Sequence, residues 1–440
     1  MTATQLAEAM SPAFLKVVER AKRDPKVQFL SLAHLVDEAA LKRAFGRIRK
    51  DAAVGVDGIT KEKYGEELER NVLRLHQRLK TLQYRHQPIR RVHIPKDKGK
   101  TRPIGISSVE DKIVQGALHE VLEAVYEPVF HDGSYGFRPG RGQHDALRAL
   151  EGPLFKGEIN WILEADIQGF FDSIDRKMLM EILRERILDG RLLRFIGKCL
   201  HVGILDGEEY SEPSEGTVQG SVLSPILGNV YLHHVLDSWF ERDVRPRLQG
   251  KACLVRYADD FIIGFQREDD AKRVLDVLRR RFERFALTLH PDKTRLLPFR
   301  RPDPGAPGGK GPATFDFLGF TVHWRRGRKG YWLPSFKTRT ARLRRSIMAV
   351  ADWCRSHRHL SVSEQHAALK RRVNGHYNYF GVNGNIRSLE IFAYHVRRAW
   401  QKWLGRRGQR ERLTWDRFTE LHRAYPLPVP TIRVQLWTSP

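Results

Sequence analysis

Residues 253–265 read Cys-Leu-Val-Arg-Tyr-Ala-Asp-Asp-Phe-Ile-Ile-Gly-Phe. Two apolar, β-prone runs flank the adjacent carboxylates Asp259 and Asp260, which predicts a tight hairpin of buried strands with both carboxylates at its tip. Like charges held side by side near a core repel each other, and a bound cation or strong hydrogen bonding relieves that cost. The stretch therefore predicts a divalent-metal site, with a solvated acidic turn as the alternative.

A third carboxylate follows a similar apolar run upstream. Residues 161–166 read Trp-Ile-Leu-Glu-Ala-Asp and predict a buried strand that ends at Asp166, ahead of a helix with apolar residues at helical spacing. If this strand neighbours the hairpin in one sheet, Asp166 lies beside Asp259 and Asp260. Such carboxylates can hold two Mg²⁺ ions about 3.5–4 Å apart, as in phosphoryl transfer. The alternative for Asp166 is a satisfied strand-end cap.

Further short motifs follow a defined order along the chain. They are Gly-Lys-Thr-Arg-Pro-Ile-Gly-Ile at 99–106, Gln-Gly-Phe-Phe-Asp at 168–172, Gln-Gly-Ser-Val-Leu-Ser-Pro at 219–225, His-Pro-Asp-Lys at 290–293 and Phe-Leu-Gly-Phe at 317–320. Together with the acidic stretches, this order resembles the block set of a reverse transcriptase, specifically that of the group II intron-encoded reverse transcriptases and maturases of bacteria. The resemblance covers residues 54–433.

The resemblance implies roles for residues around the metal site. It implies that Asp166, Asp259 and Asp260 bind two catalytic Mg²⁺ ions, with Mn²⁺ as a substitute, and that the backbone carbonyl of Ile167 is a further ligand. Lys293 is similar to the lysine that protonates the departing pyrophosphate.

The resemblance also implies a substrate-binding set. Lys96 and Arg102 match the positions where the fingers grip the triphosphate, and their charges suit phosphate oxygens. Phe171 matches the bulky residue under the sugar that excludes a 2′-hydroxyl. Gln219 matches the residue that contacts nucleotide and template, and Tyr257 adjoins the nucleotide. The alternatives are solvated surface cations for Lys96 and Arg102, and a core aromatic for Phe171.

Leu318, Gly319 and Phe320 resemble the primer grip of the family. Gly319 suits a turn that brings backbone close to the primer. Beyond this motif the composition becomes basic. Residues 323–423 hold 24 Lys and Arg against 6 Asp and Glu, a net charge of +18. The helical periodicity predicts three helices here, at residues 340–356, 363–380 and 386–404.

Cations interleaved with aromatic side chains are typical of a surface that grips structured RNA. Within the basic region the resemblance indicates a thumb that also carries the maturase function. The candidate RNA-binding residues are Arg342, Arg345, Arg371 and Arg372.

The whole chain has 77 basic and 52 acidic residues, a net charge of +25. This excess predicts a polyanionic partner whose binding weakens steeply with salt. No apolar run approaches the roughly 18 residues of a spanning helix, and no signal-like segment opens the chain, so we predict a cytoplasmic protein without a membrane partner. The three scattered cysteines argue against disulfides and a zinc site.

We predict an α+β fold of the right-handed polymerase type. The predicted parts are a helical N-terminal extension (1–57), fingers and a palm with an antiparallel sheet (58–320), a basic three-helix thumb and maturase domain (321–424) and a C-terminal tail (425–440). A stretch rich in Pro and Gly at 302–312 is predicted to be a loop.

The predicted function is RNA-directed DNA synthesis of the group II intron type, with dNTPs and a DNA primer as substrates. Binding of intron RNA, or another structured RNA, would assist splicing and mobility into a DNA target. We expect no Cys- and His-rich nuclease, so the primer would come from a nick or fork made elsewhere. Two alternatives stay open: a splicing cofactor whose polymerase is dispensable, and a domesticated reverse transcriptase in phage defence or CRISPR spacer acquisition. The sequence does not define the oligomeric state.

Overall fold

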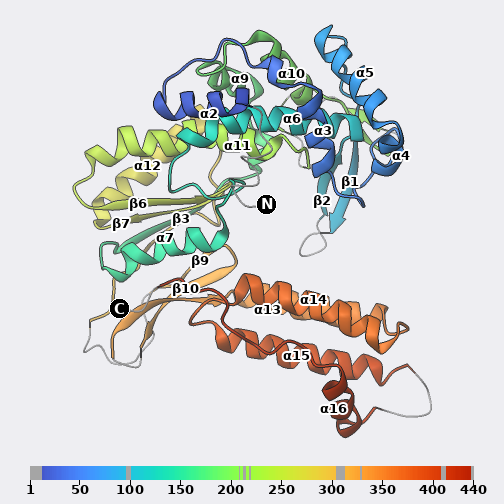
Figure 1. The fold of residues 1–440 in the computed structure, drawn as a ribbon. Coiled ribbons are helices and arrows are strands. Elements are labelled where there is room, and N and C mark those ends of the chain that lie inside the picture. The colour runs from blue at the N-terminus through green and yellow to red at the C-terminus, as the bar shows by residue number, and fades with distance from the viewer. Residues whose placement is uncertain are drawn as a thin grey trace.

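The computed structural model describes residues 12–95, 101–207, 209–211, 215–217, 220–303, 313–327, 330–407 and 413–437. Figure 1 shows helices gathered in the upper part of the molecule, an antiparallel sheet beside them and a helical lobe below. The fold is of the predicted α+β class and is compatible with a right-handed polymerase. Lys96, Gln219 and most of the predicted loop at 302–312 lie outside the described residues.

The central sheet has the strand order β6-β7-β3-β8, and all its neighbouring strands are antiparallel. Successive side chains of a strand point to opposite faces, and both faces are covered. Ile263 joins the core above the sheet, whereas Ile262 joins the core below it. This double coverage explains why the strands read as unbroken apolar runs. The strands are β3 (Trp161–Asp166), β6 (Ala252–Tyr257), β7 (Asp260–Phe265) and β8 (Arg295–Pro298).

Two smaller sheets flank the central one. The sheet β2-β1-β4-β5 belongs to the upper part, and its β1–β2 hairpin extends toward the helical lobe (Figure 1). The sheet β11-β10-β9 lies between the central sheet and the helical lobe. The strands are β1 (Ile89–Pro95), β2 (Thr101–Ile106), β4 (Ile204–Asp206), β5 (Glu209–Ser211), β9 (Phe315–Phe317), β10 (Phe320–Arg326) and β11 (Trp332–Thr338).

The upper part is built around α6, which is apolar on most of its circumference and is therefore buried. Phe14 and Leu41 of the predicted N-terminal extension join the same core, so residue 57 does not separate two cores. The helices are α2 (Pro12–Arg23), α3 (Glu38–Arg47), α4 (Lys61–Glu66), α5 (Leu68–Lys80), α6 (Val109–Tyr126), α7 (Gln143–Phe155), α8 (Phe170–Ser173), α9 (Arg176–Arg184), α10 (Gly190–Leu200), α11 (Ser224–Leu232) and α12 (Glu268–Arg284). Shorter 3₁₀ and π segments are η1 (Ala33–Leu35), η3 (Glu127–Val129), η4 (His233–Asp237), η5 (Phe240–Val244) and η6 (Arg245–Arg247).

The helical lobe consists of α13 (Thr340–Ser356), α14 (Val362–Phe380), α15 (Ile386–Leu404) and α16 (Trp415–Ala424). The first three helices agree with the predicted ranges to within one residue, whereas α16 was not predicted. Their apolar faces join α7 and the lower face of the central sheet in the second core. Within the described ranges, no helix combines the length and the apolar character needed to cross a bilayer.

Residues 425–437 form an extended segment, here named the C-terminal strap, that returns from α16 to the base of the helical lobe. His366 at the start of α14 hydrogen-bonds the carbonyl of Pro426 (2.9 Å). Farther on, the Arg148 Nε of α7 donates to the carbonyl of Gln435 (3.1 Å), and Val434 bridges Val382. The residues predicted to be a tail are therefore packed as far as 437.

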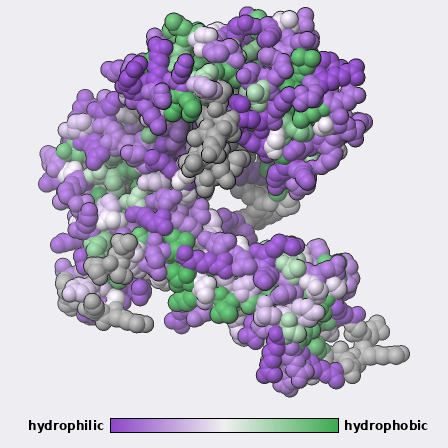
Figure 2. Space-filling view, viewed as in Figure 1, coloured by the Kyte–Doolittle hydropathy of each residue, from purple (hydrophilic) through white to green (hydrophobic). Residues whose placement is uncertain are grey.

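Figure 2 shows that the surface is hollowed between the upper part and the helical lobe and that hydrophilic residues border this hollow. The tip of the β6–β7 hairpin and the β1–β2 hairpin both belong to the side of the molecule that faces it (Figure 1).

Candidate active site

The turn between β6 and β7 consists of Ala258 and Asp259. Tyr257 pairs with Asp260 at the end of the ladder, so Asp260 is the first residue of β7, and the prediction that it sits at the tip is wrong. Ala258 has a φ of +58°, a left-handed conformation that costs a non-glycine residue roughly 1–2 kcal/mol. The turn that carries Asp259 is strained and needs support from its surroundings.

Asp166 and Asp260 are register partners in the antiparallel pair of β3 and β7. The predicted adjacency of the two strands is thereby confirmed. Because Asp166 ends β3 where Asp260 begins β7, the side chains of Asp166, Asp259 and Asp260 belong to one end of the central sheet.

The environment of these carboxylates disfavours their charged forms. Burial, followed by the charges of Asp166 and Asp259, raises the pKa of Asp260 to about 7. Burial also raises the pKa of Asp259, and Asp166 adds to this effect, while Arg102 and Lys293 act in the opposite direction. Lys293 Nζ lies 2.5 Å from Asp166 Oδ2. The cations of the chain thus offset the gathered negative charge only in part.

The donor set at this end of the sheet contains only oxygen, which suits a hard cation such as Mg²⁺. Backbone groups of Asp166 and Gln168 hydrogen-bond to residues 288–290, so the intervening carbonyl of Ile167 faces the opposite side, toward β7. In the described part of the chain no three metal-ligating side chains already surround one point, and the Asp166 carboxylate is paired with Lys293 instead. A cation bound here would share the Asp166 carboxylate with Lys293.

Behind the hairpin lies a buried network that the sequence analysis missed. Arg256 has no exposed surface and forms a two-point ion pair with Asp237 (2.8 and 2.5 Å). Its Nη1 also donates to Asn229 Oδ1 and to the carbonyl of Ala258, both at 2.9 Å. Asn229 in turn donates to the carbonyl of Gly136 (2.8 Å). Arg256 therefore connects the strained turn to α11 and η4.

Two predicted substrate residues border the same end of the sheet. Arg102 on β2 is exposed and acts electrostatically on Asp259, so the β1–β2 hairpin reaches the carboxylates. Phe171 is half-buried, whereas its neighbour Phe170 is 3 % exposed and takes the core position. A Cβ added to Gly228 would lie 3.2 Å from the Phe171 ring, so α11 supports that ring closely.

The predicted primer grip lies in the turn between β9 and β10. Leu318 and Gly319 both have left-handed backbone, with φ of +50° and +79°, and the backbone of Leu318 acts to lower the pKa of the Asp260 carboxyl, against the larger effect of burial. The Tyr379 hydroxyl donates to the Leu318 carbonyl (3.0 Å). Phe320 has no exposed surface and stacks on Tyr379, so it supports the turn from inside. Leu318 and Gly319 remain as the partly exposed part of the grip.

Residues 94–322, just over half of the chain, match the family described as reverse transcriptase (RNA-dependent DNA polymerase). The chain belongs to the reverse transcriptase family. The matched range of this reverse transcriptase contains the central sheet, the three carboxylates and the primer-grip turn.

Several known proteins are similar to this reverse transcriptase. Protein YkfC of Escherichia coli (strain K12) is 33% identical over 280 residues, which cover 56% of this chain and 74% of YkfC. The group II intron-encoded protein LtrA of Lactococcus lactis subsp. cremoris is 39% identical over 180 residues, 41% of this chain and 28% of LtrA. An uncharacterized 91 kDa protein in a cob intron of Schizosaccharomyces pombe is 46% identical over 165 residues, 38% of this chain and 20% of that protein. The chain spans about three quarters of YkfC but less than a third of the other two.

The four arginines predicted to bind RNA lie on two helices of the lobe, Arg342 and Arg345 on α13 and Arg371 and Arg372 on α14. Arg342 lies beside the primer-grip turn, since a Cβ added to Gly319 would be 3.6 Å from Arg342 Nε. Arg372 on α14 lies 4.3 Å above a tryptophan ring of α13, with Arg371 exposed next to it. Arg345 is exposed on α13. Arg342 therefore belongs to the catalytic end of the helical lobe.

Proposed function

We propose that this reverse transcriptase extends a DNA primer on an RNA template with dNTPs, and that its helical lobe binds group II intron RNA or a similarly structured RNA. The observation that supports the catalytic part most directly is the pairing of Asp166 with Asp260 beside Asp259. These three side chains and the Ile167 carbonyl would hold two Mg²⁺ ions. When bound, the ions would activate the primer hydroxyl and neutralise charge on the triphosphate.

The residues around the carboxylates have complementary tasks in this proposal. Lys293 keeps an ammonium group beside Asp166, from which a proton can pass to the departing pyrophosphate. Arg102 offers a forked guanidinium to the triphosphate oxygens. The backbone of Leu318 and Gly319, held by Tyr379, positions the primer end next to Asp260.

Primer extension on an RNA template tests the catalytic part. A DNA primer annealed to RNA is supplied with dNTPs, with and without Mg²⁺, and the product length is measured. Full-length DNA that forms only when Mg²⁺ or Mn²⁺ is present supports the proposal. A purified chain that binds the primer and template without extending the primer would favour the splicing-cofactor alternative.

The RNA-binding part is supported by charge and by similarity. Residues 323–423 carry a net charge of +18, more than contacts to a short primer–template duplex require. Two of the similar proteins bear names that refer to introns. Assistance to splicing and mobility is therefore the proposed second role of this chain.

Phe171 provides a test of the sugar pocket. Replacing Phe171 with Val is expected to raise ribonucleotide incorporation relative to dNTP incorporation by about 10-fold or more, because a smaller side chain opens space for the 2′-hydroxyl. Single-nucleotide incorporation with rNTP and dNTP measures the ratio. Phe170→Leu is the matched control, since Phe170 is a core residue and this variant should lower stability without changing the ratio. If the ratio of rNTP to dNTP incorporation does not change in Phe171→Val, Phe171 is a core residue and another side chain excludes the 2′-hydroxyl.

Arginines of the helical lobe provide a test of RNA binding. Replacing Arg345, Arg371 and Arg372 with Gln is expected to weaken binding to the cognate structured RNA by roughly 10-fold, with a salt slope shallower by about 0.7–0.9 for each lost phosphate contact. Binding to a short primer–template duplex should change less. Arg342→Gln is the contrasting variant, because its place beside Gly319 predicts a larger effect on the primer–template. If the triple variant lost affinity equally for the structured RNA and for the primer–template duplex, the result would indicate that the lobe acts only as a polymerase thumb.

A further inference from the structure

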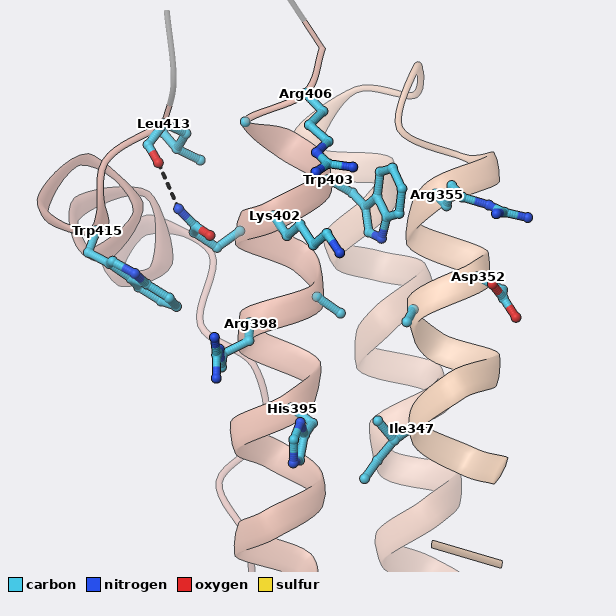
Figure 3. Close-up of a pocket in the computed structure, with 14 residues that line it drawn as sticks. Ile347, Asp352, Arg355, His395, Arg398, Lys402, Trp403, Arg406, Leu413 and Trp415 are labelled. Carbon is cyan, nitrogen blue, oxygen red and sulfur yellow. Dashed lines mark hydrogen bonds between the residues drawn. The ribbon is translucent and has the colours of Figure 1, made fainter. Parts of the chain in front are cut away.

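Figure 3 shows a groove in the helical lobe, with a volume of about 730 Å³. The ends of α13 and α15 that form it, and α16, lie on the side of the lobe away from the central sheet (Figure 1). The groove is formed by the C-terminal halves of α13 and α15 and by the first turn of α16. Its size is within the about 300–1,000 Å³ of sites that enclose a small-molecule-sized group. We name it the tryptophan groove after Trp403 and Trp415, which Figure 3 shows on opposite sides of it with Lys402 between them.

The charge of the tryptophan groove favours an anion. Among the described residues that line it, Arg355, Arg398, Lys402 and Arg406 are cations and Asp352 alone is a carboxylate. Over the residues that the structure describes, none of these four cations forms an ion pair with a carboxylate. Unpaired cations gathered around a concave surface are suited to phosphate groups.

The aromatic rings of the groove favour a ligand with a flat face. Trp415 is 48% exposed and is held edge-on by Phe418 (ring centroids 5.7 Å apart). Trp403 carries Lys402 and Arg406 over its ring, at 5.4 and 5.1 Å from the centroid. Aromatic rings beside cations bind unstacked bases by stacking while the cations bind the backbone. A duplex offers phosphates and 2′-hydroxyls, but its bases are stacked on one another and their faces are not accessible to the rings.

The walls of the groove are held in place without a ligand. Gln401 Nε2 donates to the carbonyl of Leu413 (2.7 Å), which ties α15 to the segment that enters α16. The hydroxyl of Thr414 accepts from the backbone of Arg417 and begins α16, so the turn that carries Trp415 is capped. The ring of Trp415 is therefore presented by a fixed helix start and not by a free chain.

From these observations we infer that the tryptophan groove binds an unpaired nucleotide of RNA, with its base on Trp415 and its phosphates on Arg398, Lys402 and Arg406. The inference rests on the proposed function, because it assumes that the helical lobe meets RNA. It adds a second kind of recognition, since phosphate contacts elsewhere on the lobe read only the backbone whereas this groove requires a base that is out of the stack.

The test compares two hairpin RNAs with the same number of phosphates, one with a five-nucleotide unpaired bulge and one fully paired along its stem. Their affinities for the full chain are measured by fluorescence anisotropy at one salt concentration. The double variant Trp415→Ala/Arg398→Gln is expected to lose about 10-fold in affinity for the bulged RNA and less than 2-fold for the paired RNA. Trp415→Tyr keeps a stacking ring and should bind within about 2-fold of the wild-type chain.

The matched control is Tyr331→Ala/Arg280→Gln, which also removes one exposed aromatic and one exposed arginine but lies outside the groove. This control should leave both affinities unchanged. Equal losses for bulged and paired RNA, or an unchanged affinity for bulged RNA in the double variant, would each overturn the inference. Primer extension by the wild-type chain is measured on the same preparation. If the wild-type chain does not extend the primer, the proposed polymerase activity is refuted. The affinities for bulged and paired RNA still test the inference about the tryptophan groove.

Discussion

Asp259→Asn or Asp260→Asn is expected to lower the rate of RNA-templated primer extension by roughly 1,000-fold or more, since losing one of the proposed ligands of the catalytic ions would remove several kcal/mol of transition-state stabilisation. RNA affinity should stay within about 2-fold, because the basic helical lobe carries most of that binding. Single-turnover extension and anisotropy on the same RNA measure the two quantities.

The matched control for this experiment is Asp292→Asn, which removes an exposed carboxylate next to Lys293 without touching the sheet. It should extend primers nearly as the wild-type chain does. The thermal stability of the Asp260→Asn variant should not fall, because burial and neighbouring charges already raise the pKa of this carboxyl and disfavour its charge in the folded state. If Asp259→Asn extended primers at close to the wild-type rate, the proposal that Asp259 binds a catalytic metal ion would be wrong.

The buried network behind the hairpin leads to the second large effect. Arg256→Met is expected to destabilise the chain by about 3–5 kcal/mol, because it leaves the Asp237 carboxylate buried without its partner. The double variant Arg256→Met/Asp237→Leu should recover most of this stability, since replacing both members of a buried pair by apolar groups is often close to neutral. Chemical denaturation of the wild-type chain, Arg256→Met, Asp237→Leu and the double variant measures the cycle.

The primer-extension rates of the same variants distinguish two roles of Arg256, namely support of the β6–β7 turn and neutralisation of the Asp237 charge. Arg256 also donates to the carbonyl of Ala258, the strained residue before Asp259, and the double variant lacks that contact. We therefore expect the double variant to be folded, slow in primer extension and dependent on a higher Mg²⁺ concentration. Recovery of both stability and extension rate would show that Arg256 only balances the charge of Asp237.

Three of the four strands of the central sheet, all but β8, and three of the four lobe helices could be predicted from the sequence because their signals are local. The apolar runs around Asp166 and Asp260 are continuous, and the lobe helices have clear periodicity, with a capping box from Ser361 to Glu364 at the start of α14. Helix α16 has only ten residues, and the C-terminal strap has no periodicity, so neither gave such a signal.

Other features depend on contacts between distant residues. The partners of Arg256 lie 19 and 27 residues from it, so no spacing rule connects them. Ala258 takes a left-handed conformation that composition does not suggest, and this moves Asp260 from the tip into β7. The sequence could not show that Phe320 is enclosed by residues of α14. A short motif such as Leu-Gly-Phe does not indicate whether its aromatic side chain is buried or exposed.

The C-terminal strap has a consequence for the order in which the protein can fold during synthesis. Leu436 packs in the same core as Ile162 and Ile262 of the central sheet, and the backbone of Gln435 is held by Arg148 of α7. The lower face of the sheet that carries the carboxylates is thus completed by residues made nearly 180 positions after Asp260. Before residue 436 has left the ribosome, the nascent chain can already form the upper core. The lower face of the central sheet can be completed only after the C-terminal strap has been synthesised and has left the ribosome.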